Sequence, residues 1–286
     1  MKIRQRIRGE KKYYYLEHSF RKKGKVIKKE KYLGNQIPEN IEDIKKEFEK
    51  EFKKDFINKL EKIKSNFQAE WKRIPKSAKK RELEEISIAF TYNTNAIEGS
   101  TITLEETREI ITEKIAVNKP LRDVRETEAH SIIFLQMLEK KQEISEKLLL
   151  EWHKQIFGGT KSDIAGQYRD YLVRIGPYLP PDWQDVKKLM FQFIKFLKQN
   201  KKINPVELSA RAYYKFEKIH PFGDGNGRIG RLLMNYILWH SGYPMLIIEY
   251  KNRKSHNKAF TKDESGFVSY FMRRYLAIHK NRYMKN

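Results

Sequence analysis

The stretch His220-Pro221-Phe222-Gly223-Asp224-Gly225-Asn226-Gly227-Arg228-Ile229-Gly230-Arg231 decides how this chain is interpreted. It combines an imidazole, a carboxylate, several glycines, an amide and two guanidinium groups. Phosphoryl chemistry uses these groups as a base beside the nucleophile, an oxygen ligand for a divalent cation, and backbone N–H groups that face phosphate oxygens. An ordinary glycine-rich turn needs neither a preceding histidine nor two arginines at fixed offsets. A phosphate site is therefore the favoured interpretation.

Helical periodicity surrounds this stretch on both sides. Upstream, Asn204-Pro205 is typical of a helix start, and apolar residues then recur at helical spacing up to Ile219. Downstream, apolar residues from Ile229 to His240 share one helical face, and Ser241-Gly242-Tyr243-Pro244 predicts the end of that helix. The glycines therefore lie at a helix N-terminus, where unsatisfied N–H groups and the helix dipole favour an anion.

The stretch resembles the signature of the Fic family, His-x-Phe-x-Asp/Glu-Gly-Asn-Gly-Arg-x-x-Arg, at every defined position. The resemblance implies a mainly α, Fic-type helical bundle with a β-hairpin flap. It also implies transfer of AMP from ATP to a Ser, Thr or Tyr hydroxyl of a protein target, with release of pyrophosphate. In that scheme His220 is the general base, Asp224 is the Mg²⁺ ligand and Phe222 anchors the loop in the core. The implied nucleotide-binding residues are Gly225, Asn226, Gly227, Arg228, Gly230 and Arg231.

A second segment, Thr94-Asn95-Ala96-Ile97-Glu98-Gly99, resembles the inhibitory helix motif of the same family, Ser/Thr-x-x-x-Glu-Gly/Asn. Thr94, Glu98 and Gly99 are thus predicted to be regulatory. A carboxylate at Glu98 could form a bidentate pair with Arg231 and so occupy the guanidinium that should hold the γ-phosphate. The plainer alternative is an ordinary helix end with Gly99 as the stop. The favoured interpretation is the family class with an N-terminal inhibitory helix.

A third segment, from Ala165 to Gly176, has β-prone residues between glycines. The resemblance places a β-hairpin flap here, which pairs with an extended segment of the target by strand addition. Tyr168, Arg169 and Val173 are the predicted docking residues of this flap. A surface loop is the alternative.

Composition excludes several classes of protein. The chain has 286 residues and no cysteine, so disulfides, thiolate catalysis and cysteine-ligated zinc are excluded. No apolar run approaches a membrane span, and no signal-peptide core is present at the N-terminus. We therefore expect a cytoplasmic protein that does not bind membranes.

The first 34 residues are strongly basic. They hold 13 Lys and Arg residues against three Asp and Glu residues, in a chain whose formal net charge is +23. Ile3–Ile7, Tyr13–Phe20 and Val26–Leu33 are predicted strands, with a turn at Arg21–Lys25. Interleaved aromatic and cationic residues suit nucleic acid, so residues 1–34 are a candidate nucleic-acid surface. A solvated sheet edge guarded by lysines is the alternative.

Three regions are predicted: a basic β-meander of unknown role over residues 1–36, an amphipathic helical region over 37–79, and a Fic core with its inhibitory helix over 80–286. The apolar stripe between Glu39 and Ile63 is typical of a core face or a dimer seam, so a homodimer is also considered. Further helices are predicted over Lys80–Glu98, Thr103–Ile115, Val124–Glu139, Glu143–Phe157, Gln184–Gln199 and Val268–His279.

Two functions from different classes follow from these patterns. The first is an autoinhibited protein adenylyltransferase that uses ATP and Mg²⁺ and acts on an unknown protein target. The second is a nucleic-acid-binding regulator in which the Fic core responds to nucleotide. Removal of AMP from a modified target, or transfer of another phosphate-linked group, stays open on the same site. An intact His220 favours the first function, because a purely regulatory core needs no base. Gly227 favours nucleotidyl transfer, because the related Doc-type kinases carry a lysine near this position.

Overall fold

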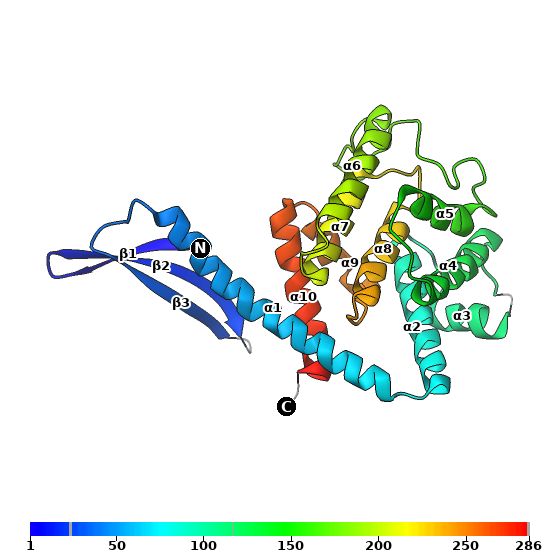
Figure 1. The fold of residues 1–286 in the computed structure, drawn as a ribbon. Coiled ribbons are helices and arrows are strands. Elements are labelled where there is room, and N and C mark those ends of the chain that lie inside the picture. The colour runs from blue at the N-terminus through cyan, green and yellow to red at the C-terminus, as the bar shows by residue number, and fades with distance from the viewer. Residues whose placement is uncertain (23–24, 116, 285–286) are drawn as a thin grey trace. The chain divides into compact units, whose positions relative to one another are not determined.

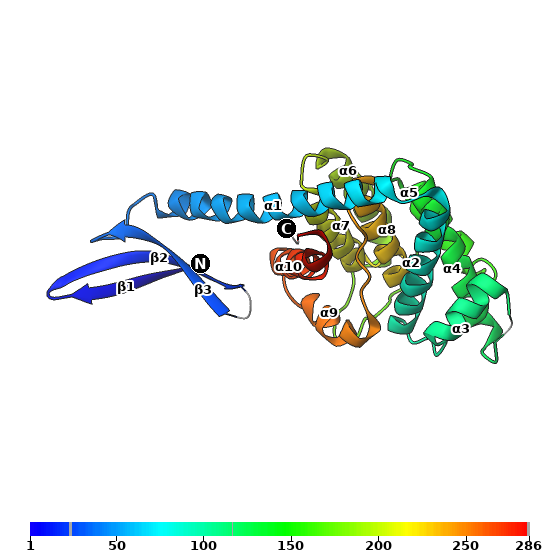
Figure 2. The same cartoon turned by 90° about the horizontal axis from the view of Figure 1, so that it is seen from below.

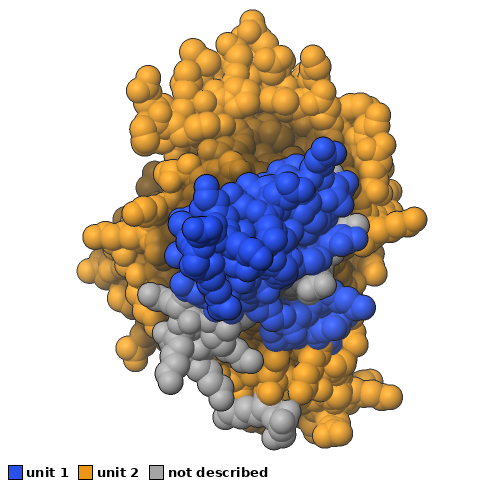
Figure 3. Space-filling model, turned by 90° about the vertical axis from the view of Figure 1, so that its left-hand side faces the viewer, with its two compact units in different colours: residues 1–61 blue, residues 62–286 orange. Residues whose placement is uncertain are grey.

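The computed structural model describes residues 1–22, 25–115 and 117–284. The described chain is mainly helical and has one three-stranded antiparallel sheet at its N-terminus (Figure 1). The predicted fold class is therefore confirmed. The chain divides into two compact units, residues 1–61 and 62–286, which Figure 3 shows in separate colours. Among the residues described, none of the helices combines the length and the apolar character that a membrane span requires.

The first unit begins with the predicted meander. Strands β1 (Lys2–Arg8), β2 (Lys11–Lys22) and β3 (Lys25–Gly34) lie in the order β1-β2-β3, and both neighbouring pairs are antiparallel. The strands are longer than the alternating segments predicted. Residues 23 and 24 of the predicted turn lie outside the described residues.

The long amphipathic segment forms helix α1 (Ile41–Arg73), which runs ten residues past the predicted end at Ile63. Its first turn is acidic and its last turn is basic, with Lys72 and Arg73 at the C-terminus, an arrangement that favours the helix dipole. The boundary between the two units falls inside this helix. Residues 37–79, predicted as a region of their own, are therefore divided between the units.

The second unit is a helical bundle built around one central helix. Helix α8 (Asn226–His240) has 12 of its 15 residues buried. It contacts α7 (Pro205–Ile219), α2 (Lys76–Ile97), α4 (Leu121–Glu139) and α5 (Glu146–Phe157), and Figures 1 and 2 show it in the middle of this unit. The other helical elements are α3 (Leu104–Arg108), which continues into a π-helical turn (Glu109–Glu113), α6 (Val186–Gln199), α9 (Arg253–Ala259) and α10 (Glu264–Tyr283).

Three buried side-chain hydrogen bonds, four residues apart along α2, link α2 to α4. They join Ser87 to Ser131 (2.9 Å), Thr91 to His130 (3.1 Å) and Asn95 to Thr127 (3.1 Å). A buried polar group loses stability when its partner is removed, so this ladder fixes the register of one helix on the other. The register matters because a carboxylate lies close in sequence to each residue of the Asn95–Thr127 pair. Glu98 caps the end of α2, and Glu126 lies on α4.

Candidate active site

The loop that joins α7 to α8 has a backbone held in an uncommon conformation. His220, which ends α7, has a φ of 51° and a ψ of 61°, in the left-handed region that residues other than glycine rarely adopt. Its N–H donates to the carbonyl of Phe216 (2.9 Å), and its own carbonyl accepts from Nε of Arg169 (2.9 Å). These contacts fix the backbone of His220 where the loop begins.

Arg169 is a structural anchor of this loop. Besides His220, its guanidinium donates to the carbonyls of Tyr171 (3.0 Å) and Pro181 (2.6 Å), and its backbone N–H donates to the carbonyl of Pro221 (2.9 Å). The residue is only 4% exposed. A buried guanidinium needs several hydrogen-bond acceptors, and these carbonyls supply them. The side chain thus faces the interior of the protein, and the docking role predicted for Arg169 stays a prediction.

Tyr168 also faces inward. Its hydroxyl donates to Glu146 (2.9 Å), and its ring lies beside Phe222, so its predicted docking role stays a prediction. Val173 is half-buried. The β-hairpin predicted over residues 165–176 does not form strands; the region has a turn at Gly176, closed by one antiparallel bridge between Ile175 and Tyr178. The large exposed side chains of this region are Tyr171, Leu172, Ile175 and Leu179.

Two residues close the loop from within. Phe222 is fully buried, as its predicted anchoring role requires, and stacks on the ring of His153 with 3.9 Å between ring centres. The Asn226 side chain accepts from the N–H of Phe222 (2.8 Å) and donates to its carbonyl (2.9 Å). The Asn226 amide is thus committed to the loop itself. Only the backbone of Asn226 remains for the predicted phosphate cradle.

His153, on α5, holds the loop in place, and no sequence motif predicted this role. Its Nδ1 accepts from the N–H of Gly166 (2.9 Å), which leaves Nε2 to donate to the carbonyl of Asp224 (3.0 Å). Burial lowers the pKa of His153 to about 4, so the ring is neutral at physiological pH. The hydrogen-bonding pattern therefore persists over the whole physiological range.

The start of α8 has the geometry of an anion site. Gly225 has a φ of 79°, and no side chain caps the first turn, so the N–H groups there have no side-chain partner among the described residues. A β-carbon at Gly225 would lie 2.4 Å from the Phe157 ring, so a side chain does not fit there. A β-carbon at Gly230 would lie 2.8 Å from Glu217 and 2.9 Å from Tyr213, both on α7, so this glycine allows close packing of α8 on α7. Its predicted role in nucleotide binding stays a prediction.

His220 has the protonation state that a general base needs. Burial lowers its pKa to about 4, and the positive charge of Arg169 acts in the same direction, so the imidazole is neutral at pH 7. Its Nδ1 is buried and has no hydrogen-bond partner among the described residues. Nε2 is therefore the nitrogen that can accept a proton from a substrate.

Glu217, one turn before His220 on α7, is a second titratable group that the sequence analysis missed. One carboxyl oxygen lies 3.9 Å from Nδ1 of His220, and the other is buried without a hydrogen-bond partner among the described residues. Burial raises the pKa of Glu217 to about 8, so it is mostly protonated and uncharged at pH 7. Its spacing of three from the histidine on a helix was the available signal.

Glu98 and Arg231 meet as predicted, with one difference. Nη2 of Arg231 donates to one oxygen of Glu98 at 2.5 Å, whereas a bidentate pair was predicted. Nε donates to the Thr94 hydroxyl (2.5 Å), and Nη2 also reaches the Thr94 carbonyl (3.3 Å). Burial alone would lower the pKa of Arg231, but Tyr213 and Glu98 raise it above its usual value, so the guanidinium is charged.

The Glu98 carboxylate lies directly over the glycine cradle. A β-carbon at Gly227 would be 2.2 Å from its Oε1 atom. Gly99, with a φ of 95°, ends α2 at this point, so the motif is both a helix end and the source of the carboxylate. The two interpretations of Thr94–Gly99 from the sequence are therefore compatible.

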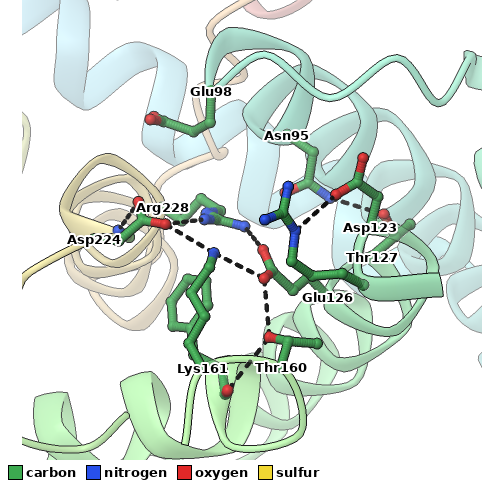
Figure 4. Close-up of polar contacts among 12 residues, drawn as sticks. Asn95, Glu98, Asp123, Glu126, Thr127, Thr160, Lys161, Asp224 and Arg228 are labelled. Atoms are coloured by element: carbon green, nitrogen blue, oxygen red, sulfur yellow. Dashed lines mark hydrogen bonds and ion pairs between the residues drawn. The ribbon is translucent and has the colours of Figure 1, made fainter. Parts of the chain in front are cut away.

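A four-membered charge network lies beside the cradle (Figure 4). Lys161 reaches between the carboxylates of Glu126 (2.8 Å) and Asp224 (2.7 Å), and Arg228 pairs with Glu126. Burial would raise the pKa of Glu126, but Arg228 and Lys161 outweigh it and hold that pKa below its usual value. Both Glu126 and Lys161 escaped the sequence analysis, because neither lies near the signature in sequence.

Asp224 suits one ligand position of a divalent cation. Its side chain is 45% exposed, and its oxygens face the cleft that the network lines. Among the described residues, no group of three or more His, Asp or Glu side chains could hold an ion by itself. Mg²⁺ is commonly held by one carboxylate plus substrate phosphates and water, so the residues present fit an ion that arrives with a nucleotide. The cleft is lined by Asn95, Glu98, Gly99, Ser100, Arg122, Asp123, Glu126, Lys161, Asp224 and Arg228.

The loop, its flanking helices and the bundle around them match a known family. A model of the Fic/DOC family matches residues 143–238. The chain belongs to the Fic/DOC family. The protein adenylyltransferase Fic of Nematostella vectensis is 34% identical over 201 residues, 68% of this chain and 47% of that protein. The protein of the same name from Culex quinquefasciatus is 35% identical over 201 residues, 68% of this chain and 40% of that protein. This Fic chain therefore spans less than half the length of these two relatives.

Solved structures agree with this assignment. A Fic-domain-containing signalling protein from Bacteroides thetaiotaomicron superposes with a TM-score of 0.67 at 25% identity, over 77% of this chain and 96% of that one. A Fic-1 fragment from C. elegans superposes with a TM-score of 0.69 at 27% identity, over 83% of this chain and 72% of that one. The Fic fold therefore extends well beyond the residues that the family model matches.

The position of Lys161 in this Fic protein generates a prediction about metal binding. Its ammonium group occupies the side of Asp224 that a cation would approach, so Lys161→Met should tighten binding of Mn²⁺ to the nucleotide-free protein. We expect about a fivefold gain, the scale of one nearby charge at a partly exposed site. Free Mn²⁺ measured by electron paramagnetic resonance reports the affinity. Lys147→Met, at an exposed position of α5, is the matched control. Unchanged or weaker Mn²⁺ binding in Lys161→Met would contradict the prediction.

Proposed function

We propose that this protein is an adenylyltransferase that moves AMP from ATP to a hydroxyl of a protein target. The observation that carries the proposal is a neutral, partly exposed imidazole at His220 beside an uncapped helix N-terminus. A base and an anion site within a few residues of each other suit transfer of a phosphate-linked group. The names of the relatives in Nematostella and Culex support the same activity.

In the proposed reaction one bond forms, one bond breaks and one proton is transferred. The target hydroxyl oxygen forms a bond to the α-phosphorus of ATP, the bond from that phosphorus to the bridging oxygen breaks, and pyrophosphate leaves. The hydroxyl proton passes to Nε2 of His220, which its low pKa keeps unprotonated beforehand. The N–H groups of the first turn of α8 would hold phosphate oxygens, and Arg231 would pair with the terminal phosphate.

Mg²⁺ is proposed as the metal partner of the nucleotide. When bound, it would neutralise phosphate charge and so favour departure of pyrophosphate. Asp224 would supply the protein oxygen, and this requires it to exchange its contact with Lys161 for the ion.

Autoinhibition is proposed from the contact of Glu98 with Arg231. A phosphate that pairs with Arg231 must displace this carboxylate, which also covers Gly227. An intramolecular carboxylate is present at high effective concentration, so it should usually win against free nucleotide. The protein would then belong to the class whose inhibitory helix precedes the Fic core.

Partners follow from the same site. A target segment would approach His220 past the flap turn at Gly176, where the exposed apolar side chains offer a surface for docking. An unknown protein target and a homodimer both stay predictions.

Isotope position tests the proposed chemistry. Purified protein is incubated with Mg²⁺ and with ATP labelled at either the α- or the γ-phosphorus, and the protein-bound label is counted. We expect transfer of the α-label only, and loss of transfer in His220→Ala with ATP binding largely retained, because the base acts on the hydroxyl. Label arriving only from the γ-position would make the protein a kinase and overturn the proposal.

The pKa of His220 generates a second prediction. In protein labelled with ¹³C-histidine, the Cε1 signal that disappears in His220→Ala should not titrate between pH 8 and about 5.5, because its midpoint lies near pH 4 rather than near the usual 6.5. NMR spectra recorded across this range give the midpoint directly. A midpoint between pH 6 and 7 would show that the ring is not desolvated as the structure implies.

The contest for Arg231 generates a third prediction. Glu98→Gly should raise self-modification by α-labelled ATP about tenfold or more, because the competing carboxylate is gone. ATP should also raise the melting temperature more in this variant than in the parent, since the nucleotide then pairs a buried cation that lacks its carboxylate.

Arg231→Ala is the partner in a double-mutant comparison. Added to Glu98→Gly, it should cancel the gain, because the site would lack its phosphate partner. If Glu98→Gly lowers activity or leaves it unchanged, the inhibitory assignment fails while the isotope experiment can still support adenylyl transfer.

A further inference from the structure

One face of the N-terminal sheet gathers tyrosines and arginines. Residues directly opposite each other in antiparallel strands point to the same face. Arg4 lies opposite Tyr15, Arg6 opposite Tyr13, and Tyr15 opposite Tyr32. These five residues, from all three strands, therefore share one face, which we call the tyrosine face.

The three rings of the tyrosine face form one cluster. The ring centres of Tyr15 and Tyr32 are 5.3 Å apart, and those of Tyr13 and Tyr32 are 6.2 Å apart. The Arg6 guanidinium lies 4.6 Å above the centre of the Tyr15 ring. Tyr32 is 53% exposed, although burial of a large ring is favourable. The cluster thus offers ring surface to a ligand.

The opposite face of the sheet belongs to the core of the first unit. Leu16, which points away from the tyrosine face, is fully buried. Lys31, its partner on β3, pairs with Glu47 of α1 (3.9 Å). Helix α1 therefore lies over this face, as Figure 2 shows for the first part of the helix. The tyrosines lie on the face that α1 leaves open.

The tyrosine face is also positively charged. Its two carboxylates are already engaged, because Glu17 pairs with Arg4 (3.1 Å) and Glu30 pairs with Arg6. Among the described side chains, the same alternation adds four further cations to this face, which are Lys2, Arg8, Lys11 and Lys28. Cations therefore outnumber carboxylates here, and the surface suits a polyanion.

We propose that the tyrosine face binds single-stranded nucleic acid, with bases on the tyrosine rings and the phosphate backbone along the cations of β1. Aromatic rings on an open sheet face flanked by arginines are suited to unpaired bases. The ring planes are inclined to one another by 42° and 49°. Bases that lie on these rings are inclined to one another and cannot stack as they do in a duplex. A single strand therefore fits this face, whereas a duplex does not. The site is independent of the proposed transferase activity.

Fluorescence anisotropy with the full-length chain tests this proposal. The probes are fluorescein-labelled 12-nucleotide oligomers of deoxythymidine and of uridine, and a mixed-sequence DNA duplex of the same length. We expect both single strands to bind more tightly than the duplex, with affinity falling steeply as salt rises. The difference in affinity between the two single strands shows which of the two probes the tyrosine face prefers.

Matched variants separate stacking from charge. Tyr32→Leu should weaken single-strand binding roughly tenfold, whereas Tyr32→Phe should keep it, because only the phenylalanine retains a ring face. Arg8→Gln should reduce the slope of log affinity against log salt by about one. Lys12→Gln removes the same charge from the opposite face of the sheet and should leave affinity within about twofold of the parent.

Two results would overturn the proposal. One is duplex binding as tight as single-strand binding, which would leave only a general attraction to polyanions. The other is equal affinity of Tyr32→Leu and Tyr32→Phe, together with equal effects of Arg8→Gln and Lys12→Gln, which would show that neither the rings nor this face of the sheet carries the binding.

Discussion

The buried charge of Arg231 is the constraint on which the site depends. A guanidinium deep in a helical bundle costs several kcal/mol unless it is paired and hydrogen-bonded. The structure meets this cost with Thr94 and Glu98 from α2, so α2 must lie against the first turns of α8. In the proposed reaction, a nucleotide would have to offer Arg231 a replacement anion. The interaction that stabilises the fold would then also select the ligand.

The α2–α4 ladder turns this constraint into a defined geometry. Its last rung, Asn95 with Thr127, sets the height of both helices beside α8. Glu98 follows by three residues on α2, and Glu126 precedes Thr127 on α4. The register of α2 on α4 therefore places Glu98 beside Arg231 and Glu126 beside Arg228. A slip of α2 by one turn would leave Arg231 without its carboxylate, so the register of α2 on α4 and the contact that we propose to be inhibitory are linked.

The fold and the signature were predictable because their information is local. Helical periodicity, a proline-marked helix start and twelve consecutive residues predicted α7, the loop and α8. The segment that we propose to be inhibitory was likewise recognised from six consecutive residues. Arg169 shows where this kind of inference ends. Its sequence context is that of an exposed flap, and only the tertiary structure shows that three backbone carbonyls from two loops turn its side chain inward. Glu126, Lys161 and His153 escaped for the same reason, since their partners lie far away in sequence.

In the nucleotide-free site, carboxylates pair with the cations. These carboxylates differ in burial and in their number of contacts. Glu126 is 6% exposed, pairs with both Arg228 and Lys161, and accepts from Thr160, so displacing it would strand a buried carboxylate. Glu98 is 31% exposed, makes a single contact with Arg231 and caps the C-terminal end of α2. Glu98 can therefore return to solvent once another anion pairs with Arg231, whereas Glu126 would stay buried without a partner. Arg231 is therefore the cation that can change partner, and Arg228 is held in place to shape the cleft.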